Sequence, residues 1–313
     1  MNGRVDLHIH TTASDGTLSP TAAVRAALAN GVSLLGVADH DTTEGIREAE
    51  WEAKDTGLVL VPGVELSVGQ EAKEIHVLGY FVDPDERSLQ AALETLRGAR
   101  DLRNERILAR LKEIGVPVSR ERVHEISGGG TLGRPHIAKA LVEAGHVSSE
   151  SEAFRRFLAR GKPGYVGRER LSPAEAADAI RQAGGIPVLA HPAKLGSKRA
   201  IEDLLDQGMD GVEVYHSDHT EVEAEMLLEI AARRGLLVTG GSDSHGPHSD
   251  RPIEIGSLDI PEWVGEQVLA RAPRHWMEAR GFDSAQPSLR AKPRSRPTRS
   301  TGSGQAPSEV EGR

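Results

Sequence analysis

The chain has 313 residues, of which 38% are hydrophobic and 27% charged, proportions typical of a globular protein that buries a sizeable core. It contains no cysteine, which excludes disulfides, thiolate metal sites and cysteine nucleophiles, so any metal must bind imidazole and carboxylate groups. The formal net charge of −9 argues against a broad nucleic-acid-binding surface.

The first residues show no pattern of a leader or membrane segment. Polar residues 1–4 lead directly into an apolar run, without the basic segment and long apolar stretch of a secretory signal. Nowhere do about 18 apolar residues follow one another without interruption, the length that a membrane span needs. We therefore expect a cytoplasmic protein without membrane contact.

Short β-branched or aliphatic runs alternate with helix-like stretches along most of the chain. The runs occupy residues 5–9, 34–38, 58–61, 75–80, 186–190, 211–215 and 236–239. Helix start signals lie between them, such as Ser19-Pro20 before residues 21–29 and Ser172-Pro173 before residues 174–183. This alternation predicts an α/β fold with parallel strands.

One long segment interrupts the alternation. From about Glu86 to Arg160 the strand pattern disappears, and three or four helical stretches follow one another. Strand-like runs resume at Ile186, so the sheet is built from residues on both sides of the segment. We expect a discontinuous barrel or sheet of residues 1–85 and 161–283, with residues 86–160 inserted as a helical cap.

The last thirty or so residues differ from the rest in composition. Residues 284–313 are rich in Ser, Pro, Arg, Thr and Gly, with almost no large apolar side chains. Six of them are basic and two acidic, a net charge of +4 that leaves −13 for residues 1–283. We expect a disordered, solvated tail without a site of its own.

The first apolar run carries the first candidate metal ligands. Asp6, His8 and His10 alternate, and a strand places every second side chain on the same face. Asp15 follows in the turn-forming Ser14-Asp15-Gly16, from which its carboxylate can return toward that face. Alternating histidines also occur on solvated strands, so this pair alone indicates only that a metal site is possible.

Histidine and carboxylate side chains follow most of the later apolar runs or lie within them. The carboxyl ends of parallel barrel strands converge on one rim, where active sites of such folds are built. We expect six histidines and three carboxylates to meet there: His8, His10, Asp15, His40, Glu65, His76, His191, Asp243 and His245. Each has a plainer explanation alone, but chance does not readily place so many ionisable residues at strand ends. His216 also ends a run and stays an open candidate.

Six short motifs resemble those of PHP-domain phosphoesterases: Val5-Asp6-Leu7-His8-Ile9-His10-Thr11, Asp15-Gly16, Ala38-Asp39-His40-Asp41, Gly63-Val64-Glu65, His191-Pro192 and Ser242-Asp243-Ser244-His245. The resemblance covers about residues 5–280. It implies a distorted seven-stranded (β/α) barrel of the TIM type. It also implies three divalent ions on the rim, usually manganese, with iron or zinc as alternatives.

Carried over residue by residue, the resemblance implies a role for each ligand. One ion would bind His8, His10, Glu65 and Asp243, a second Asp15, His40 and His245, and a third Glu65, His76 and His191. Clustered divalent ions neutralise charge on a phosphate ester and lower the pKa of bound water. We therefore expect hydrolysis by a metal-activated hydroxide, with Asp6 either orienting an imidazole or forming a salt bridge at the strand start.

The expected cap carries arginines that suit phosphate groups. Arg97, Arg100, Arg103 and Arg106 are spaced by three, with Asn104 among them, and Arg134 lies in a Gly-Arg-Pro-His motif. With the Gly-Lys-Pro-Gly-Tyr of residues 161–165, these pieces resemble the family branch that acts on nucleoside 3′,5′-bisphosphates and the 5′ ends of short RNAs. A solvated helix face is the alternative for the arginine stripe. From the resemblance we expect five substrate-binding residues: Arg103, Asn104, Arg134, His40 and His245.

Three other functions remain open at this point. A histidinol-phosphate phosphatase would use the same barrel, but we expect it to lack the arginine-bearing cap. A non-catalytic PHP binding module would not need the full ligand set. An amidohydrolase acting on C–N bonds also uses His-x-His on a barrel, typically with two metals and a modified lysine.

Overall fold

The computed structural model describes residues 3–70, 73–129, 132–167 and 171–280 of the chain. The expected tail, residues 284–313, lies outside these ranges. Among the described residues, no helix combines the length and apolar character required to cross a membrane.

Seven strands form one sheet in which each strand pairs with its neighbours in the sequence. They are β1 (Arg4–Ile9), β2 (Val32–Val37), β3 (Val59–Gln70), β4 (Lys73–Tyr80), β5 (Ile186–Leu189), β6 (Gly211–His216) and β7 (Leu237–Gly241). Backbone hydrogen bonds from Asp243 to His8 (2.8 Å) and from His10 to Ser244 (2.9 Å) join the two ends of the sheet. The sheet is therefore nearly closed, and the prediction of a distorted seven-stranded (β/α) barrel is confirmed.

The direction of β4 differs from the prediction. β4 runs antiparallel to both β3 and β5, whereas the other neighbouring pairs are parallel. The expectation of parallel strands throughout is therefore wrong at this strand. Because β3 leads into β4 as a hairpin, the beginning of β4 lies at the rim where the other strands have their carboxyl ends.

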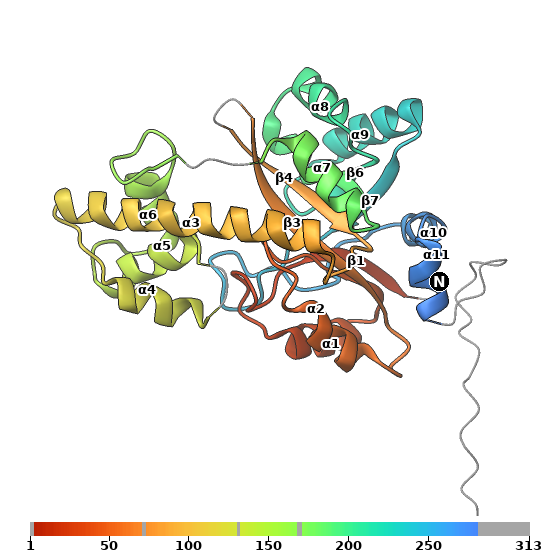
Figure 1. Cartoon of the computed structure of the whole chain (residues 1–313), viewed down its shortest axis with the longest axis horizontal. Helices are drawn as coiled ribbons and strands as arrows, with labels where there is room; N and C mark the ends of the chain where they lie inside the picture. The colour runs from red at the N-terminus through yellow and green to blue at the C-terminus, as the bar shows by residue number, and fades with distance from the viewer. Residues whose placement is uncertain (1–2, 71–72, 130–131, 168–170, 281–313) are drawn as a thin grey trace, which may run out of the picture.

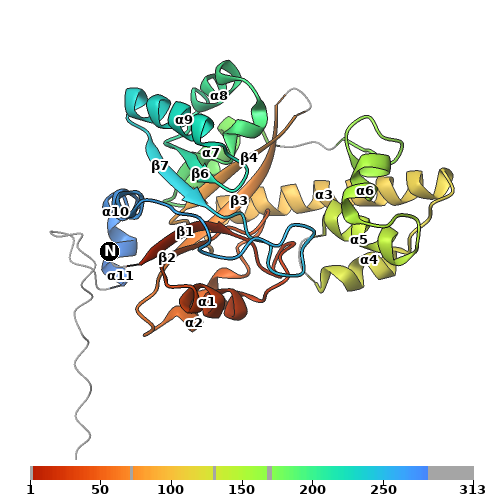
Figure 2. The same ribbon diagram turned by 180° about the vertical axis from the view of Figure 1, so that it is seen from behind.

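Helices surround the sheet (Figures 1 and 2). They are α1 (Pro20–Ala29), α2 (Ile46–Ala53), α7 (Pro173–Gln182), α8 (Lys198–Leu205), α9 (Glu221–Arg234), α10 (Glu262–Ala270) and α11 (Arg274–Ala279), with a short 3₁₀ helix η2 (Pro192–Leu195). The predicted start signals are confirmed, since Ser19 caps α1 and Ser172 caps α7, each followed by a proline in the first turn.

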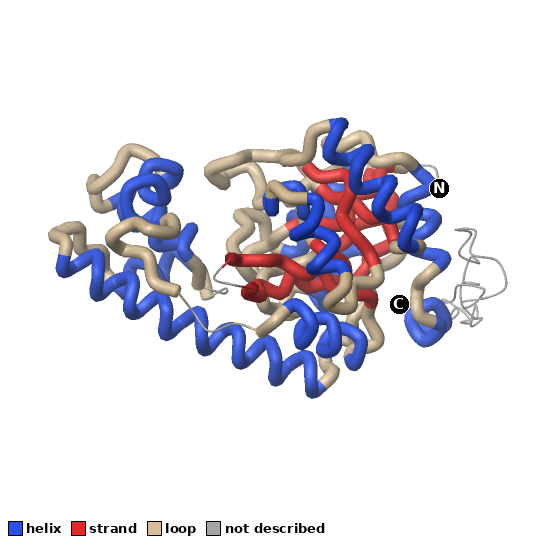
Figure 3. Tube along the Cα trace, turned by 90° about the horizontal axis from the view of Figure 1, so that it is seen from above, coloured by secondary structure: helices blue, strands red, loops and turns tan. Residues whose placement is uncertain are grey.

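A second, helical lobe lies to one side of the barrel (Figure 3). It contains the long helix α3 (Arg87–Glu113), α4 (Arg120–Ser127), α5 (Arg134–Glu143), α6 (Glu150–Ala153) and the π-helix η1 (Phe154–Leu158). The first half of α3 packs into the barrel core through Leu89 and Leu93, whereas Ile107 belongs to a separate hydrophobic cluster of the lobe. Val166 joins that second cluster as well. The lobe corresponds to the expected cap; the boundaries at residues 86 and 160 stay a prediction, because α3 is shared by both cores.

Candidate metal centre

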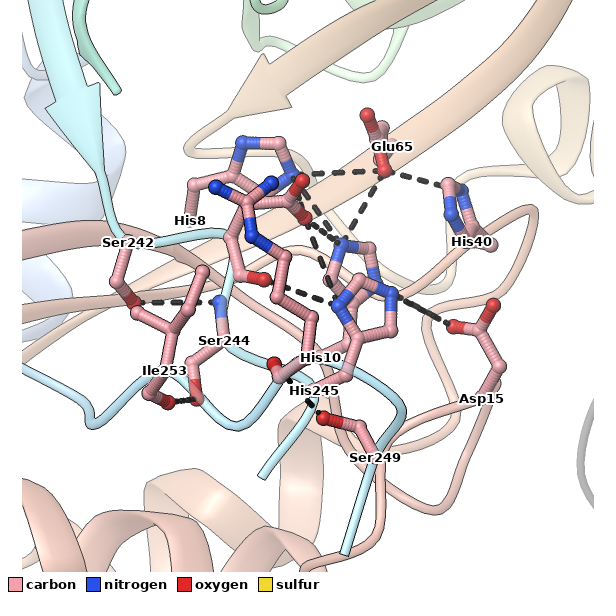
Figure 4. Close-up of polar contacts among 12 residues, drawn as sticks. His8, His10, Asp15, His40, Glu65, Ser242, Ser244, His245, Ser249 and Ile253 are labelled. Carbon is pink, nitrogen blue, oxygen red and sulfur yellow. Dashed lines mark hydrogen bonds and ion pairs between the residues drawn. The ribbon is translucent and has the colours of Figure 1, made fainter. Parts of the chain in front are cut away.

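Glu65 lies at the middle of the rim and is 1% exposed. Its Oε2 lies 2.9 Å from His40 Nδ1, 3.3 Å from His10 Nε2 and 3.4 Å from His8 Nε2. Figure 4 shows the carboxylate facing these three imidazoles. The other oxygen, Oε1, lies 2.9 Å from His76 Nδ1 and 3.0 Å from His191 Nε2. Each oxygen of Glu65 thus faces a different group of histidines.

Asp243 and Asp15 complete the arrangement. Asp243 Oδ1 lies 3.1 Å from His10 Nε2 and 3.7 Å from His245 Nδ1. Asp15 Oδ1 lies 3.4 Å from His245 Nε2 and 3.8 Å from His10 Nδ1. With these contacts the structure brings all nine residues expected at the rim into one cluster.

Close backbone packing sets the position of several of these side chains. A Cβ on Gly241 would lie 2.3 Å from the Cβ of His8, so only glycine lets β7 approach β1 at this point. Asp243 (φ 55°) and His191 (φ 30°) have left-handed backbone conformations that non-glycine residues rarely adopt. Such conformations concentrate at functional sites, where the surrounding structure holds them.

The β3–β4 hairpin explains the positions of Glu65 and His76. We expected Glu65 beyond the end of its strand, but β3 continues to Gln70, so this expectation is wrong. Ser67 pairs with His76 across the antiparallel ladder, which makes Glu65 and His76 diagonal neighbours on one face. His76 reaches the rim because it lies near the start of β4.

The spacing of the donor atoms fits bound divalent cations. His8 Nε2 and His10 Nε2 are 3.2 Å apart, and His76 Nδ1 and His191 Nε2 are 3.1 Å apart. Two imidazole nitrogens on one tetrahedral ion, each at about 2.05 Å, lie roughly 3.3 Å apart. His10 Nδ1 is also buried without a hydrogen-bond partner among the described residues, which costs about 1–3 kcal/mol. Nitrogen and oxygen donors in this geometry suit manganese, iron or zinc.

The carboxylates of the cluster are ionised at neutral pH. Burial alone would raise the pKa of Glu65, but the imidazoles of His40 and His76 hold it well below its usual range. The pKa values of Asp15 and Asp243 are likewise well below their usual range, despite burial, because of neighbouring imidazoles. These are the forms that bind a cation.

Two residues of β6 also contact the cluster. Glu213 is fully buried; its Oε1 lies 3.0 Å from His8 Nδ1, and its Oε2 accepts a hydrogen bond of 2.8 Å from the backbone N–H of His191. His216, the open candidate, has its Nε2 3.3 Å from Asp243 Oδ2. A register shift after Glu213 lets both side chains turn inward, although residues three apart lie on opposite faces of a regular strand.

Glu213 was not predicted, although the sequence contains a signal for it. It is a charged residue inside an otherwise apolar strand, and such residues are rarely buried without a partner.

Asp6 has a different role from the one expected. Its carboxylate accepts hydrogen bonds from the backbone N–H groups of Ser242 (2.9 Å) and Gly256 (2.7 Å), and among the described residues it contacts neither an imidazole nor a cation. The expectation for Asp6 is therefore wrong, and Glu213 orients His8 instead.

The arginine stripe of α3 divides between several environments. Arg100 forms an ion pair with Asp41, next to His40, and donates to Ser67 Oγ (2.8 Å). Arg106, by contrast, is exposed. The stripe is thus not one solvated face: part of it connects α3 to the loop that carries His40.

Three expected substrate-binding residues lie in the cap. Arg103 Nε donates to the carbonyl of Val166 (2.7 Å), and Asn104 Nδ2 donates to the carbonyl of Leu132 (3.1 Å). Both side chains are 4% exposed. Arg134, on the first turn of α5, is half-buried. Their assignment to substrate stays a prediction.

A cavity of about 280 Å³ lies between the cluster and the cap. Asp15, Asp243 and His245 line its metal-centre side. Apolar, basic and acidic side chains of the cap and of neighbouring loops line the rest, including Ile126, Pro135, His136, Lys139, Glu150, Phe154, Lys194, Asp218, Asp250 and Arg251. The cavity therefore has residues of the cluster at one end and a mixed wall of apolar, cationic and anionic groups at the other.

Comparisons with known proteins give consistent matches. The PHP domain matches residues 6–153. A 5′-3′ exoribonuclease of Haemophilus influenzae is 36% identical over 270 residues, 84% of this chain and 97% of the relative. A 3′,5′-nucleoside bisphosphate phosphatase of Chromobacterium violaceum is 34% identical over 78% of this chain and 87% of the relative. A candidate metal-dependent phosphoesterase from Bifidobacterium adolescentis superposes with a TM-score of 0.79 at 34% identity, over 86% of this chain and 96% of that one.

Proposed function

The chain belongs to the PHP-domain family of phosphoesterases, and from this membership we propose that it hydrolyses phosphate monoesters of nucleotides. Nucleoside 3′,5′-bisphosphates and the 5′ ends of short RNAs are the proposed substrates. The observation that carries the proposal is the cavity, because it connects a cluster of imidazoles and carboxylates with a wall of apolar and charged side chains. Its apolar groups suit a nucleoside, and its cations Lys139, Lys194 and Arg251 suit a second phosphate.

We propose three divalent ions, with manganese first and iron or zinc as alternatives. One would bind His8, His10, Glu65 and Asp243, a second Asp15, His40 and His245, and a third Glu65, His76 and His191. The contacts of the two Glu65 oxygens with separate groups of histidines support its role as a bridge. When bound, the ions would neutralise charge on the phosphate and lower the pKa of water.

The protein side chains hold and orient the reacting groups. Glu213 accepts a hydrogen bond from the Nδ1–H of His8, which leaves Nε2 free to bind a cation. His245 lines the cavity, so its side chain can contact a phosphate that enters. Arg134 is the best placed of the proposed cap residues, because the adjoining Pro135 and His136 line the cavity. We propose that it binds the phosphate that is not hydrolysed, while Arg103 and Asn104 support the cap on the same side.

The proposal is tested by measuring phosphate release from metal-reconstituted protein. A nucleoside 3′,5′-bisphosphate, a short 5′-phosphorylated RNA and histidinol phosphate serve as substrates. We expect release from the first two and little from the third. Preference for histidinol phosphate would favour the alternative phosphatase, and no release from any substrate would refute the phosphoesterase proposal in favour of a binding module.

The Arg134→Ala variant tests whether Arg134 binds substrate or supports the metal centre. We expect its KM for nucleotide substrates to rise by about tenfold or more, because a charge-assisted hydrogen bond is lost. Its metal content should equal that of the wild type. Loss of metal would show that Arg134 supports the cluster and does not bind substrate.

A further inference from the structure

Lys194 places a positive charge directly beside the metal centre. It belongs to η2 (Pro192–Leu195), which begins one residue after a predicted metal ligand. Its Nζ lies 3.1 Å from Asp218 Oδ2 and 3.7 Å from Asp243 Oδ2. The other oxygen of Asp243, Oδ1, lies 3.1 Å from His10 Nε2. Asp243 therefore has the cluster on one side and an ammonium group on the other.

The ammonium group is accessible to a ligand. Lys194 lines the same cavity as Asp243 and His245, and its side chain is 44% exposed. Burial alone would lower the pKa of Lys194, but the carboxylates of Asp243 and Asp218 raise it, so the group stays charged at neutral pH. A phosphate that enters the cavity and reaches the cluster meets this charge.

The contact with Asp218 can be exchanged at low cost. Asp218 also forms an ion pair with Arg251, so its charge stays compensated when Lys194 turns away. Arg251 itself already forms an ion pair with Asp218. Lys139, another cation of the cavity wall, lies on α5 of the cap. Of these three cations, Lys194 is the one within 4 Å of a predicted metal ligand.

We propose that Lys194 binds the scissile phosphate, exchanging Asp218 for a non-bridging oxygen of a phosphate monoester dianion at the metal centre. This inference rests on the proposed function. The dianion carries two negative charges, which its non-bridging oxygens share. An ammonium group held beside the cluster stabilises this charge more than water does. Because the contact is with the phosphate and not the nucleoside, it acts on any monoester that enters the cavity.

The test uses the metal-reconstituted full chain with Lys194→Met, Lys194→Arg and the control Lys198→Met. Lys198 is exposed on α8, four residues further along the chain. Activity is measured on p-nitrophenyl phosphate and on a nucleoside 3′,5′-bisphosphate. For Lys194→Met we expect kcat/KM to fall on the order of 100-fold on both substrates, with unchanged metal content. Lys194→Arg should restore part of the loss, and Lys198→Met should behave as the wild type.

Several outcomes would overturn the proposal. These are wild-type activity of Lys194→Met, loss of metal from it, or a loss confined to the nucleotide. Calorimetric titration of the metal-loaded protein with inorganic phosphate provides a readout that is independent of turnover. We expect Lys194→Met to bind phosphate about tenfold more weakly. A wild type that hydrolyses no ester would refute the proposed function, whereas equal phosphate affinities would refute the role of Lys194.

Discussion

Single residues of the centre differ in how well the sequence predicted them. His8 and His10 could be predicted because strand alternation alone places both on one face. Glu213 could not, because its inward orientation depends on a register shift in β6 that no local sequence pattern indicates. Residues that gather in the cluster are therefore predictable from spacing, whereas a contact such as that of Glu213 with His8 depends on how strands meet.

Replacing Glu213 by glutamine should weaken metal binding. The carboxylate accepts from both His8 Nδ1 (3.0 Å) and the backbone of His191 (2.8 Å), and an amide cannot accept both bonds through one oxygen. Loss of such a partner typically lowers metal affinity about 10- to 100-fold. Metal content after gel filtration and titration with Mn²⁺ would measure the effect.

The control for this variant is Glu223→Gln. Glu223 belongs to the exposed capping box of α9, so the same substitution there should leave the metal affinity unchanged. Resonances of the imidazole nitrogens add a second readout, because Glu213→Gln should release the preference of His8 for a proton on Nδ1. Full metal affinity of a folded Glu213→Gln protein would contradict the prediction.

At the scale of elements, the hairpin of β3 and β4 is the feature that the sequence did not show. The apolar runs at residues 58–61 and 75–80 read as separate strands, and the extension of β3 to Gln70 joins them. Helix boundaries were easier, because Ser19 and Ser172 cap α1 and α7 with side-chain hydrogen bonds that depend on local sequence alone. Helix boundaries can thus be predicted from local sequence, whereas the direction of strand pairing depends on which strands are neighbours in the fold.

Because β7 lies close to β1 at Gly241, a methyl group at this position should lower the stability of the fold. A Cβ there would lie 2.3 Å from the Cβ of His8 and 2.4 Å from its backbone nitrogen. We expect Gly241→Ala to lower the free energy of unfolding by about 1–3 kcal/mol, as overpacked positions do. Urea denaturation measures this change.

Gly98→Ala is the matched control. Gly98 lies within α3, and a Cβ there would meet no atom within 4 Å. Alanine should stabilise this exposed helix position by about 0.5–1 kcal/mol. Equal effects of the two substitutions would contradict the steric explanation for Gly241.

The ion pair of Arg100 with Asp41 connects the cap helix to the loop of His40. Removing one member of a buried pair costs about 3–5 kcal/mol, since the other charge stays buried. We expect Arg100→Met to lower stability by this amount and to weaken metal binding through the displaced loop. Arg106→Met, an exposed position of the same helix, should change neither property. Unchanged metal affinity in folded Arg100→Met would show that the ion pair stabilises the cap without affecting the metal centre.

At the scale of the whole molecule, the separate hydrophobic clusters of barrel and lobe and the cavity between the rim and the cap explain why the chain needs both lobes. The barrel supplies the imidazoles and carboxylates of the cluster, and the cap supplies the apolar side chains of Ile126, Pro135 and Phe154. The missing strand pattern of residues 86–160 predicts a separate cap, and its boundaries stay a prediction. It could not predict that α3 is shared by both cores, because its apolar residues look alike along its length.

Metal binding should stabilise the whole chain, because the proposed ligands come from strands across the barrel. The ion proposed for His8 and Glu65 would join β1 to β3, and the ion proposed for Glu65 and His76 would join β3 to β4, so each would bind only the folded state. Binding at a free concentration of 1,000 times Kd contributes about 4 kcal/mol to the free energy of unfolding for each ion. We expect a chelator to lower Tm, and Mn²⁺ added in excess to restore it.

Asp15→Asn should reduce this Mn²⁺-dependent rise of Tm, since the residue belongs to the cluster, whereas Asp178→Asn on the exposed face of α7 should preserve it. A Tm that is independent of chelator and of Mn²⁺ would mean that the cluster holds no ion under these conditions.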